Sequence, residues 1–370
     1  MDTTETVGKR VSTIDGLRGF LALSVMFYHG LINYNYVTGE GWKAAGKLFY
    51  KPLGGVAVMF FFMITAFLFW SRLLKTAGKP DWKTLYINRF FRVAPLYTVT
   101  ILAMLLIVFW RSGHKLHEPI LIFARSAVHW LAFGMDDTMP VVNAFPLTIF
   151  ILMGVTWSIR YEWYFYFSLV VLSVFVQLRM HMAFAIIGLT ASLATMMTST
   201  DVAWSFISAF FCGIATASLI HEGIRPRLPQ WAMSGIALVA LAVMFSVAIT
   251  HDGVPQVVLT GVAFYLICSG ASFFGVLRLK AAGRLGHTSY GIYLMQGLPM
   301  TLLFWNERFK TWAVRSADHY WISLFLCAFV LCILSALTYV LIERPFIAIG
   351  KHLGKMGAGR IPGSPHPHSH

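Results

Sequence analysis

The sequence predicts an all-α integral membrane protein of about ten transmembrane helices, with both ends of the chain in the cytoplasm. The 370 residues are 58% hydrophobic and 12% charged, with a mean hydropathy of +0.69, and a soluble protein cannot bury that much apolar surface. The apolar runs are continuous and lack the period-two alternation of a membrane β-barrel, which favours helices. Basic residues around the runs set the orientation.

Ten apolar runs, each bounded by charged or turn-forming residues, are candidates to cross a bilayer. They are residues 17–37, 54–71, 94–110, 157–178, 183–199, 202–220, 232–250, 256–277, 287–305 and 320–342. The region 111–155 also contains apolar pieces, but one is short and the other is broken by Asn143 and Pro146. We expect a long external loop there, with interfacial or re-entrant segments.

The charge distribution agrees with this topology. If the N-terminus is inside, 19 of the 29 basic residues and 6 of the 15 acidic residues fall on the cytoplasmic side. The net charge is then +13 inside and +1 outside, as the positive-inside rule requires. The formal net charge of +14 is therefore a topology signal, and no nucleic-acid partner is expected. The first run is not followed by a signal-peptidase pattern, so we expect it to remain as a helix.

We expect one membrane domain over residues 1–350 and a disordered, Gly/Pro/His-rich cytoplasmic tail over 351–370. The four cysteines lie inside apolar runs and form neither a CxxC pair nor a disulfide framework. Alternating histidines in the tail offer weak metal binding as a less favoured alternative. No metal site and no permanently bound cofactor is expected.

The first run carries ionisable side chains that a lipid-facing helix does not need. Arg18 and His29 are eleven residues apart, so they share one helix face and lie about 16 Å apart along the axis. If Arg18 lies near the cytoplasmic surface, His29 lies near the midplane, where an ionisable group is costly and is a functional candidate by default. A histidine satisfied by a neighbouring helix is the alternative.

Arg89 and Arg92 form a second cluster at the cytoplasmic mouth of the third run. Residues three apart are neighbours on a helix surface, and paired guanidinium groups suit the bidentate binding of phosphate. Anchoring to anionic lipid head groups is the alternative.

Ser158, Glu162 and Tyr166 recur every four residues at the external end of the fourth run. A carboxyl group in this aromatic setting must be paired with an arginine or hold a proton. The alternative is an interfacial aromatic belt with a salt bridge at the helix start.

A polar stripe in the ninth run is made by Ser289, Tyr293 and Gln296, and it faces the bundle interior. Hydrogen bonds between helices explain it as well as substrate contact does. After the last run, Pro345 is expected to end the helix, and Glu343 is expected to pair with a basic neighbour as a structural feature.

Five ordered motifs together resemble the bacterial acyltransferase family 3 membrane proteins. They are Asp15-Gly16-Leu17-Arg18-Gly19 with His29, the run Val58–Phe67, Arg89-x-x-Arg92 followed by Pro95 and Tyr97, Trp157-Ser158 with Glu162, Phe165 and Tyr166, and Ser289-Tyr290 with Tyr293. Three positions depart from the family pattern: Ala66 replaces a glycine, Gln296 stands where histidine is common, and Arg160 replaces a small or apolar residue.

The resemblance implies an acyltransferase of the bacterial inner membrane that is acyl-CoA-dependent, with the bilayer, acyl-CoA and a glycan as partners. It moves an acyl group, acetyl being favoured, from cytoplasmic acetyl-CoA to a hydroxyl of a glycan such as lipopolysaccharide O-antigen or exopolysaccharide. A transporter or exporter of a glycan or lipid-linked intermediate is the alternative, although no inverted repeat is visible, and an assembly protein is a third reading.

Residue roles follow from the same resemblance. Arg89 and Arg92 bind the CoA phosphates, and His29 is the general base or a transient acyl carrier. Arg18 orients the donor or stabilises developing negative charge. Glu162, from the outer side, orients the imidazole or binds the sugar. The residues expected to line the substrate path are Ser158, Tyr166, Ser289, Tyr290 and Tyr293.

Overall fold

A computed structural model describes residues 3–43, 51–135, 138–247 and 253–358. The protein is 79% helical, and the described ranges hold no strand beyond an isolated bridge between Val142 and Phe145. The expected all-α class is confirmed.

Each of the ten apolar runs overlaps a helix in the described part of the chain. The helices at these runs are α1 (Thr3–Val37), α2 (Lys51–Lys75), α3 (Trp82–Arg111), α6 (Trp157–Gln177), α7 (His181–Thr198), α8 (Ala203–His221), α9 (Gln230–Val247), α10 (Val254–Ser269), α11 (Lys280–Met295) and α14 (Ala317–Thr338). Between or after them lie α4 (Ile120–Leu131), α5 (Thr148–Ile151), η2 (Val276–Arg278), α12 (Gly297–Phe304), α13 (Glu307–Ala313), η3 (Tyr339–Glu343) and α15 (Arg344–Ala358).

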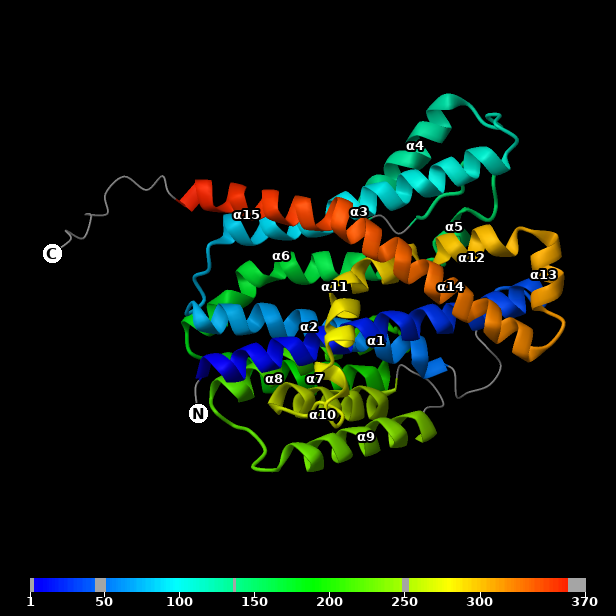
Figure 1. Ribbon diagram of the computed structural model, residues 1–370. Helices are drawn as coiled ribbons and strands as arrows, with labels where there is room; N and C mark the ends of the chain where they lie inside the picture. Colours follow the sequence, from blue (N-terminus) through cyan, green and yellow to red (C-terminus); the bar gives the residue numbers. More distant parts are fainter. Residues whose placement is uncertain (1–2, 44–50, 136–137, 248–252, 359–370) are drawn as a thin grey trace.

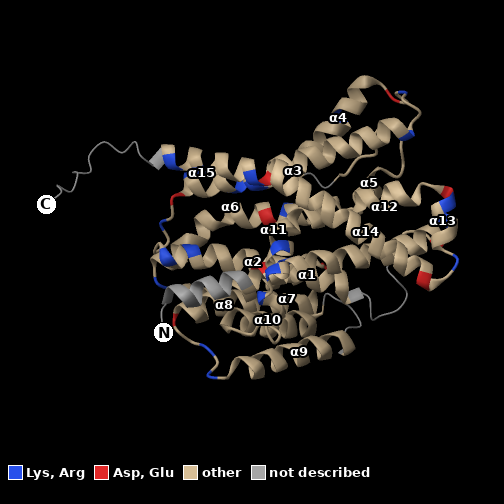
Figure 2. Cartoon of the chain, in the orientation of Figure 1, with Lys and Arg blue, Asp and Glu red and all other residues tan. Residues whose placement is uncertain are grey.

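The long helices lie side by side, and the start of α1 and the end of α15 lie at the same end of the bundle (Figure 1). Within the described residues, six helices are long and apolar enough to cross a membrane: residues 52–75, α3, α6, α7, α8 and the continuous stretch 317–356. Charged residues gather at the helix ends and in the middle of the bundle near α1 and α11, whereas outer helices such as α9 and α14 carry few of them along their length (Figure 2). The count of ten spans and the cytoplasmic ends stay predictions.

Helix α3 starts twelve residues before the expected run, so both arginines of the second cluster lie inside a regular helix. Asp81 caps its start by accepting a hydrogen bond of 3.0 Å from the Thr84 backbone N–H. Hydrogen bonds from Thr84 also lower the pKa of the Asp81 carboxyl. Pro95 lies within the helix and does not end it.

The expectation that Pro345 ends the last helix is wrong. The five-residue π-helix η3 joins α14 to α15 in one continuous stretch, and Pro345 lies just after η3. Its missing N–H therefore falls beside a turn that already departs from α-helical hydrogen bonding. The expected disordered tail is also wrong over residues 351–358, which are helical because α15 packs along α3. Residues 359–370 lie outside the described part of the chain.

Helices α1 and α11 pack at very short range through glycines. A Cβ atom on Gly286 of α11 would overlap the Asp15 carbonyl oxygen of α1, and one on Gly16 would overlap the carbonyl oxygen of Leu277 in η2, just before α11. Small residues allow two helix backbones to approach in this way. The contact fixes Arg18 on α1 beside Ser289 on α11, although 271 residues separate them in the chain.

Candidate active site

A cavity of about 460 Å³ lies among α1, α2, α3, α6, α11 and α15. Seven acidic or basic side chains of the described chain line it: Asp15, Arg18, Arg72, Arg89, Arg92, Glu162 and Lys351. Five of the seven are basic, so the cavity favours an anionic ligand. We call it the basic cavity.

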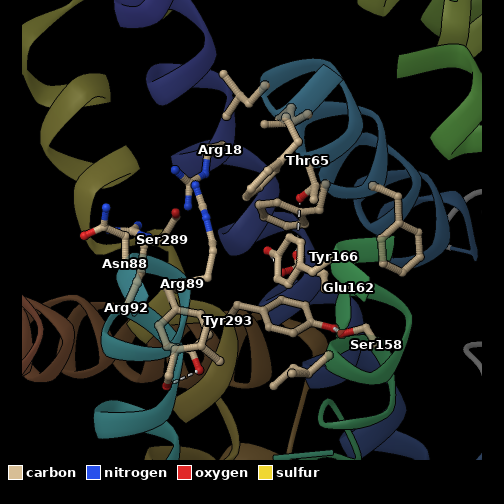
Figure 3. Close-up of a pocket in the computed structure, with 18 of the residues that line it drawn as sticks. Arg18, Thr65, Asn88, Arg89, Arg92, Ser158, Glu162, Tyr166, Ser289 and Tyr293 are labelled. Atoms are coloured by element: carbon tan, nitrogen blue, oxygen red, sulfur yellow. Dashed lines mark hydrogen bonds between the residues drawn. The ribbon is translucent and has the colours of Figure 1, made fainter. Parts of the chain in front are cut away.

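Arg18 reaches the basic cavity from α1, and Arg89 and Arg92 reach it from the start of α3 (Figure 3). The expected apolar run starts at residue 17, but α1 begins at Thr3, so Arg18 lies about 22 Å along the helix from its start. One Arg18 guanidinium nitrogen, Nη1, is 3.8 Å from Asp15 Oδ1. The three arginines therefore line the same cavity, and the single negative charge of Asp15 does not neutralise their three positive charges.

Aromatic rings hold Arg89 in place. Its guanidinium carbon lies 4.3 Å from the ring centre of Phe69 and 5.8 Å from that of Tyr166. Arginine on an aromatic face keeps its N–H edge available for an anion while the ring stabilises its charge.

Glu162 lies in the basic cavity with the arginines. Its Oε2 accepts a hydrogen bond of 2.7 Å from the Tyr166 hydroxyl, and its Oε1 accepts one of 3.4 Å from Thr65 Oγ1 (Figure 3). The expected order, with His29 between the arginines below and Glu162 above, is therefore wrong. The polar partners that face Glu162 on α2 and α6 hold it at the level of the arginines.

His29 lines a second cavity of about 320 Å³ that adjoins the first. Among its described lining residues no lysine, arginine, aspartate or glutamate occurs, and five of them are aromatic: Tyr28, Trp42, Trp157, Phe206 and Tyr293. We call it the aromatic cavity. Arg18 and His29 thus share a helix face, as predicted, but open into different spaces.

The protonation of the His29 ring is set by Gln296, which lies in the break between α11 and α12. Gln296 Nε2 donates a hydrogen bond of 2.7 Å to the Tyr293 carbonyl oxygen, so its Oε1 faces His29 Nδ1 at 3.1 Å. An amide oxygen only accepts, which places the proton on Nδ1. His29 Nε2 is then left with a lone pair that can take a proton.

Tyr293 and Val58 line both cavities and form the wall between them. The Tyr293 hydroxyl lies 2.8 Å from Ser158 Oγ and donates to the Val155 carbonyl oxygen at 3.3 Å. A substrate group that passes from one cavity to the other must therefore pass this tyrosine.

The remaining residues predicted to line the substrate path also meet here. Ser158, Tyr166, Ser289, Tyr290 and Tyr293 all line the basic cavity. Four of them donate to backbone carbonyl oxygens. Besides Tyr293, these are Ser158 Oγ to that of Val155 at 3.2 Å, the Tyr290 hydroxyl to that of Val93 at 3.0 Å and Ser289 Oγ to that of Gly286 at 2.8 Å. The bonds of Ser289 and Tyr293 match the alternative of local and interhelical hydrogen bonding for that polar stripe.

Several lining residues were assigned no role from the sequence, among them Thr65, Asn88 and Lys351. Thr65 bonds to Glu162, and Asn88 Oδ1 is buried on the basic cavity with no hydrogen-bond partner within the described residues. Lys351 comes from the segment assigned to the tail. Two sequence signals could have identified the first two residues. Asn88 directly precedes Arg89, and Thr65 is the one polar residue within Val58–Phe67.

Residues 11–341 match the sequence profile of the acyltransferase family 3, described as an acyltransferase domain. The chain therefore belongs to this family, and it is a membrane acyltransferase. Neither the curated proteins nor the solved structures that were searched gave a match.

Proposed function

We propose that this protein transfers an acyl group, acetyl in the favoured case, from cytoplasmic acyl-CoA to a hydroxyl of a surface or periplasmic glycan. O-antigen and exopolysaccharide are acceptors of this class, and the bacterial inner membrane is the proposed location. The observation that carries the proposal is the pair of adjoining cavities, one lined by arginines and one lined by aromatic rings and His29.

The basic cavity suits the donor. Acyl-CoA carries its phosphates and its thioester at opposite ends of a long flexible arm. Arg89 and Arg92 bind the phosphates with charge-assisted hydrogen bonds. Arg18 lies about 16 Å from His29 along α1, so it orients the donor and does not stabilise charge at the reacting carbon.

The aromatic cavity suits the acceptor. Aromatic side chains such as Trp42 and Trp157 present flat apolar faces with polar edges, a surface on which a sugar ring can stack. His29 Nε2 removes the proton from the acceptor hydroxyl as its oxygen attacks the thioester carbon. The carbon–sulfur bond then breaks, and the CoA thiolate recovers the proton from the imidazolium. The products are the acylated glycan and free CoA.

The proposal is tested by acyl transfer from labelled acetyl-CoA to glycan in membranes that contain the His29→Ala variant. We expect transfer to fall by about a hundredfold or more, because general base catalysis contributes 10²–10⁴-fold. His352→Ala, an exposed histidine on α15, is the matched control and should leave transfer unchanged. If the His29→Ala variant transfers acyl groups at the wild-type rate, with equal amounts of protein inserted in the membrane, His29 is not the general base.

Donor binding is tested separately with Arg89→Ala combined with Arg92→Ala. Each lost charge-assisted hydrogen bond is worth about 1.5–3 kcal/mol, so the KM for acetyl-CoA should rise at least tenfold. Tryptophan fluorescence quenching by acetyl-CoA measures the same loss at equilibrium. If donor binding is undiminished, the phosphates are bound elsewhere. A transporter, unlike this enzyme, would neither transfer nor hydrolyse the labelled acetyl group.

A further inference from the structure

A cluster of three metal-ligating side chains lies outside the two cavities described above, where α7 begins and α8 ends. His181 is the first residue of α7, His221 is the last residue of α8, and Glu222 is its C-cap. One nitrogen of each imidazole and one carboxylate oxygen lie within 4.8 Å of one another. It is the one such group of three among the residues that the structure describes.

The geometry of the cluster is close to that of a metal site. His181 Nε2 is 3.1 Å from Glu222 Oε1, and the two imidazole rings have centres 5.6 Å apart at an interplanar angle of 84°. Ligand atoms of a tetrahedral zinc ion bound at about 2.0 Å lie roughly 3.3 Å apart. Since His221 is exposed, a small rotation of its ring can bring its nitrogen to this distance from the other two ligand atoms.

His181 offers the cluster a nitrogen that is already held in place. The residue is 9% exposed. A buried side chain has little rotamer freedom left to lose when it binds a metal. Its Nε2 faces the carboxylate and the second imidazole.

We propose that His181, His221 and Glu222 bind a divalent transition-metal ion, with Zn²⁺ as the fitting species. Two imidazoles and one carboxylate suit Zn²⁺, whereas Mg²⁺ and Ca²⁺ take oxygen ligands. The exposed side of the cluster leaves a fourth position for water.

The metal would join two helices that already pack together, at a place where one of them has little of its surface covered by the protein. Among the six candidate spans, α7 has the lowest share of buried residues, 17% of its window. His181 is one of its three buried residues, with Ala185 and Ser192. A metal bound across the α7 start and the α8 end adds a link that exists only in the folded protein, so it stabilises the fold.

The test uses the purified full-length chain in detergent, with His366→Ala, His368→Ala and His370→Ala in every sample to remove the tail histidines as competitors. Zn²⁺ is titrated by calorimetry, and Co²⁺ is titrated by its visible absorption. We expect about one ion per chain, and a rise in thermal stability that EDTA reverses.

His221→Ala and Glu222→Gln are the deciding variants, because both residues are exposed and their replacement leaves the packing intact. Each should weaken Zn²⁺ binding at least tenfold, since even the loss of a residue behind a metal ligand costs about 10–100-fold. His352→Ala is the control and should bind as the parent does. The absence of Zn²⁺ binding in the parent, or unchanged binding in both variants, would overturn the site.

Discussion

Gln296 holds the imidazole of His29 by one hydrogen bond and the backbone of α11 by another. The second bond fixes the direction of the amide, and the amide then fixes which ring nitrogen of His29 carries the proton. Gln296, which is not proposed to contact either substrate, thus favours one tautomer of His29, the proposed base. Gln296 is also a position where the sequence departs from the pattern it resembles, so the arrangement belongs to this chain.

Replacement of this amide provides a test at the residue scale. Gln296→Met keeps the length of the side chain but removes the side-chain acceptor that faces Nδ1, which leaves the His29 ring its backbone partner, Val25. We expect kcat for acyl transfer to fall at least about tenfold, with the KM for acetyl-CoA nearly unchanged. Gln296→Glu restores an acceptor oxygen and should recover part of kcat. Equal kcat values for Gln296→Met and the wild type would show that the tautomer is not set here.

Much of the candidate site was predictable from residue type and spacing. The i, i+3 and i, i+4 patterns correctly placed Arg89 with Arg92 and Glu162 with Tyr166 on shared faces. The position of Glu162 along the bundle axis, relative to His29, was not predictable. It depends on how far α6 is shifted lengthwise relative to α1. Nothing in one helix specifies that offset, and the bond from Thr65 on α2 reveals it only in three dimensions.

At the scale of the element, the approach of α1 and α11 depends on the absence of side chains. Gly286 faces the Asp15 carbonyl oxygen of α1, and Gly19 faces Leu285 and Gly286 of α11, at distances that a Cβ atom cannot share. Backbone atoms yield far less than flexible side chains do, so a larger residue must push the helices apart. Arg18 and Ser289 would separate with them.

A substitution at this crossing tests its role. Gly286→Val should lower acyl transfer strongly and lower the melting temperature of the purified protein by several degrees, because overpacking costs about 1–3 kcal/mol. Gly283→Ala is the matched control on the same helix, since a Cβ there meets nothing within 4 Å. It should leave transfer and melting temperature close to those of the wild type. A Gly286→Val protein with normal activity would show that the two helices need not touch.

Element boundaries show where hydropathy is a good guide and where it is not. The apolar runs at α6, α7 and α8 matched the helices within two residues at each end, because loops with polar or turn-forming residues flank them. The starts of α1 and α3 were missed, since those helices continue through polar residues past the apolar run. A period of hydrophobicity marks burial, and a helix can extend beyond the part that is buried.

At the scale of the whole molecule, the sequence predicted a helical membrane bundle but not its two internal spaces. The cavities are enclosed by helices from both halves of the chain, among them α1, α2, α6 and α11. Contacts between residues that are so far apart in the chain produce no pattern in any local stretch of sequence, so the cavities could not be predicted from it. The basic residues counted for topology also include a smaller group of arginines that line a cavity inside the protein (Figure 3).

The wall made by Tyr293 and Val58 has a kinetic consequence. Because each proposed substrate has its own space, either one can bind without displacing the other, and the reaction passes through a ternary complex. Double-reciprocal plots of initial rate against acetyl-CoA at several acceptor concentrations should therefore intersect. Parallel lines, together with exchange of label between acetyl-CoA and CoA in the absence of acceptor, would instead identify an acylated enzyme, with His29 as the residue that carries the acyl group.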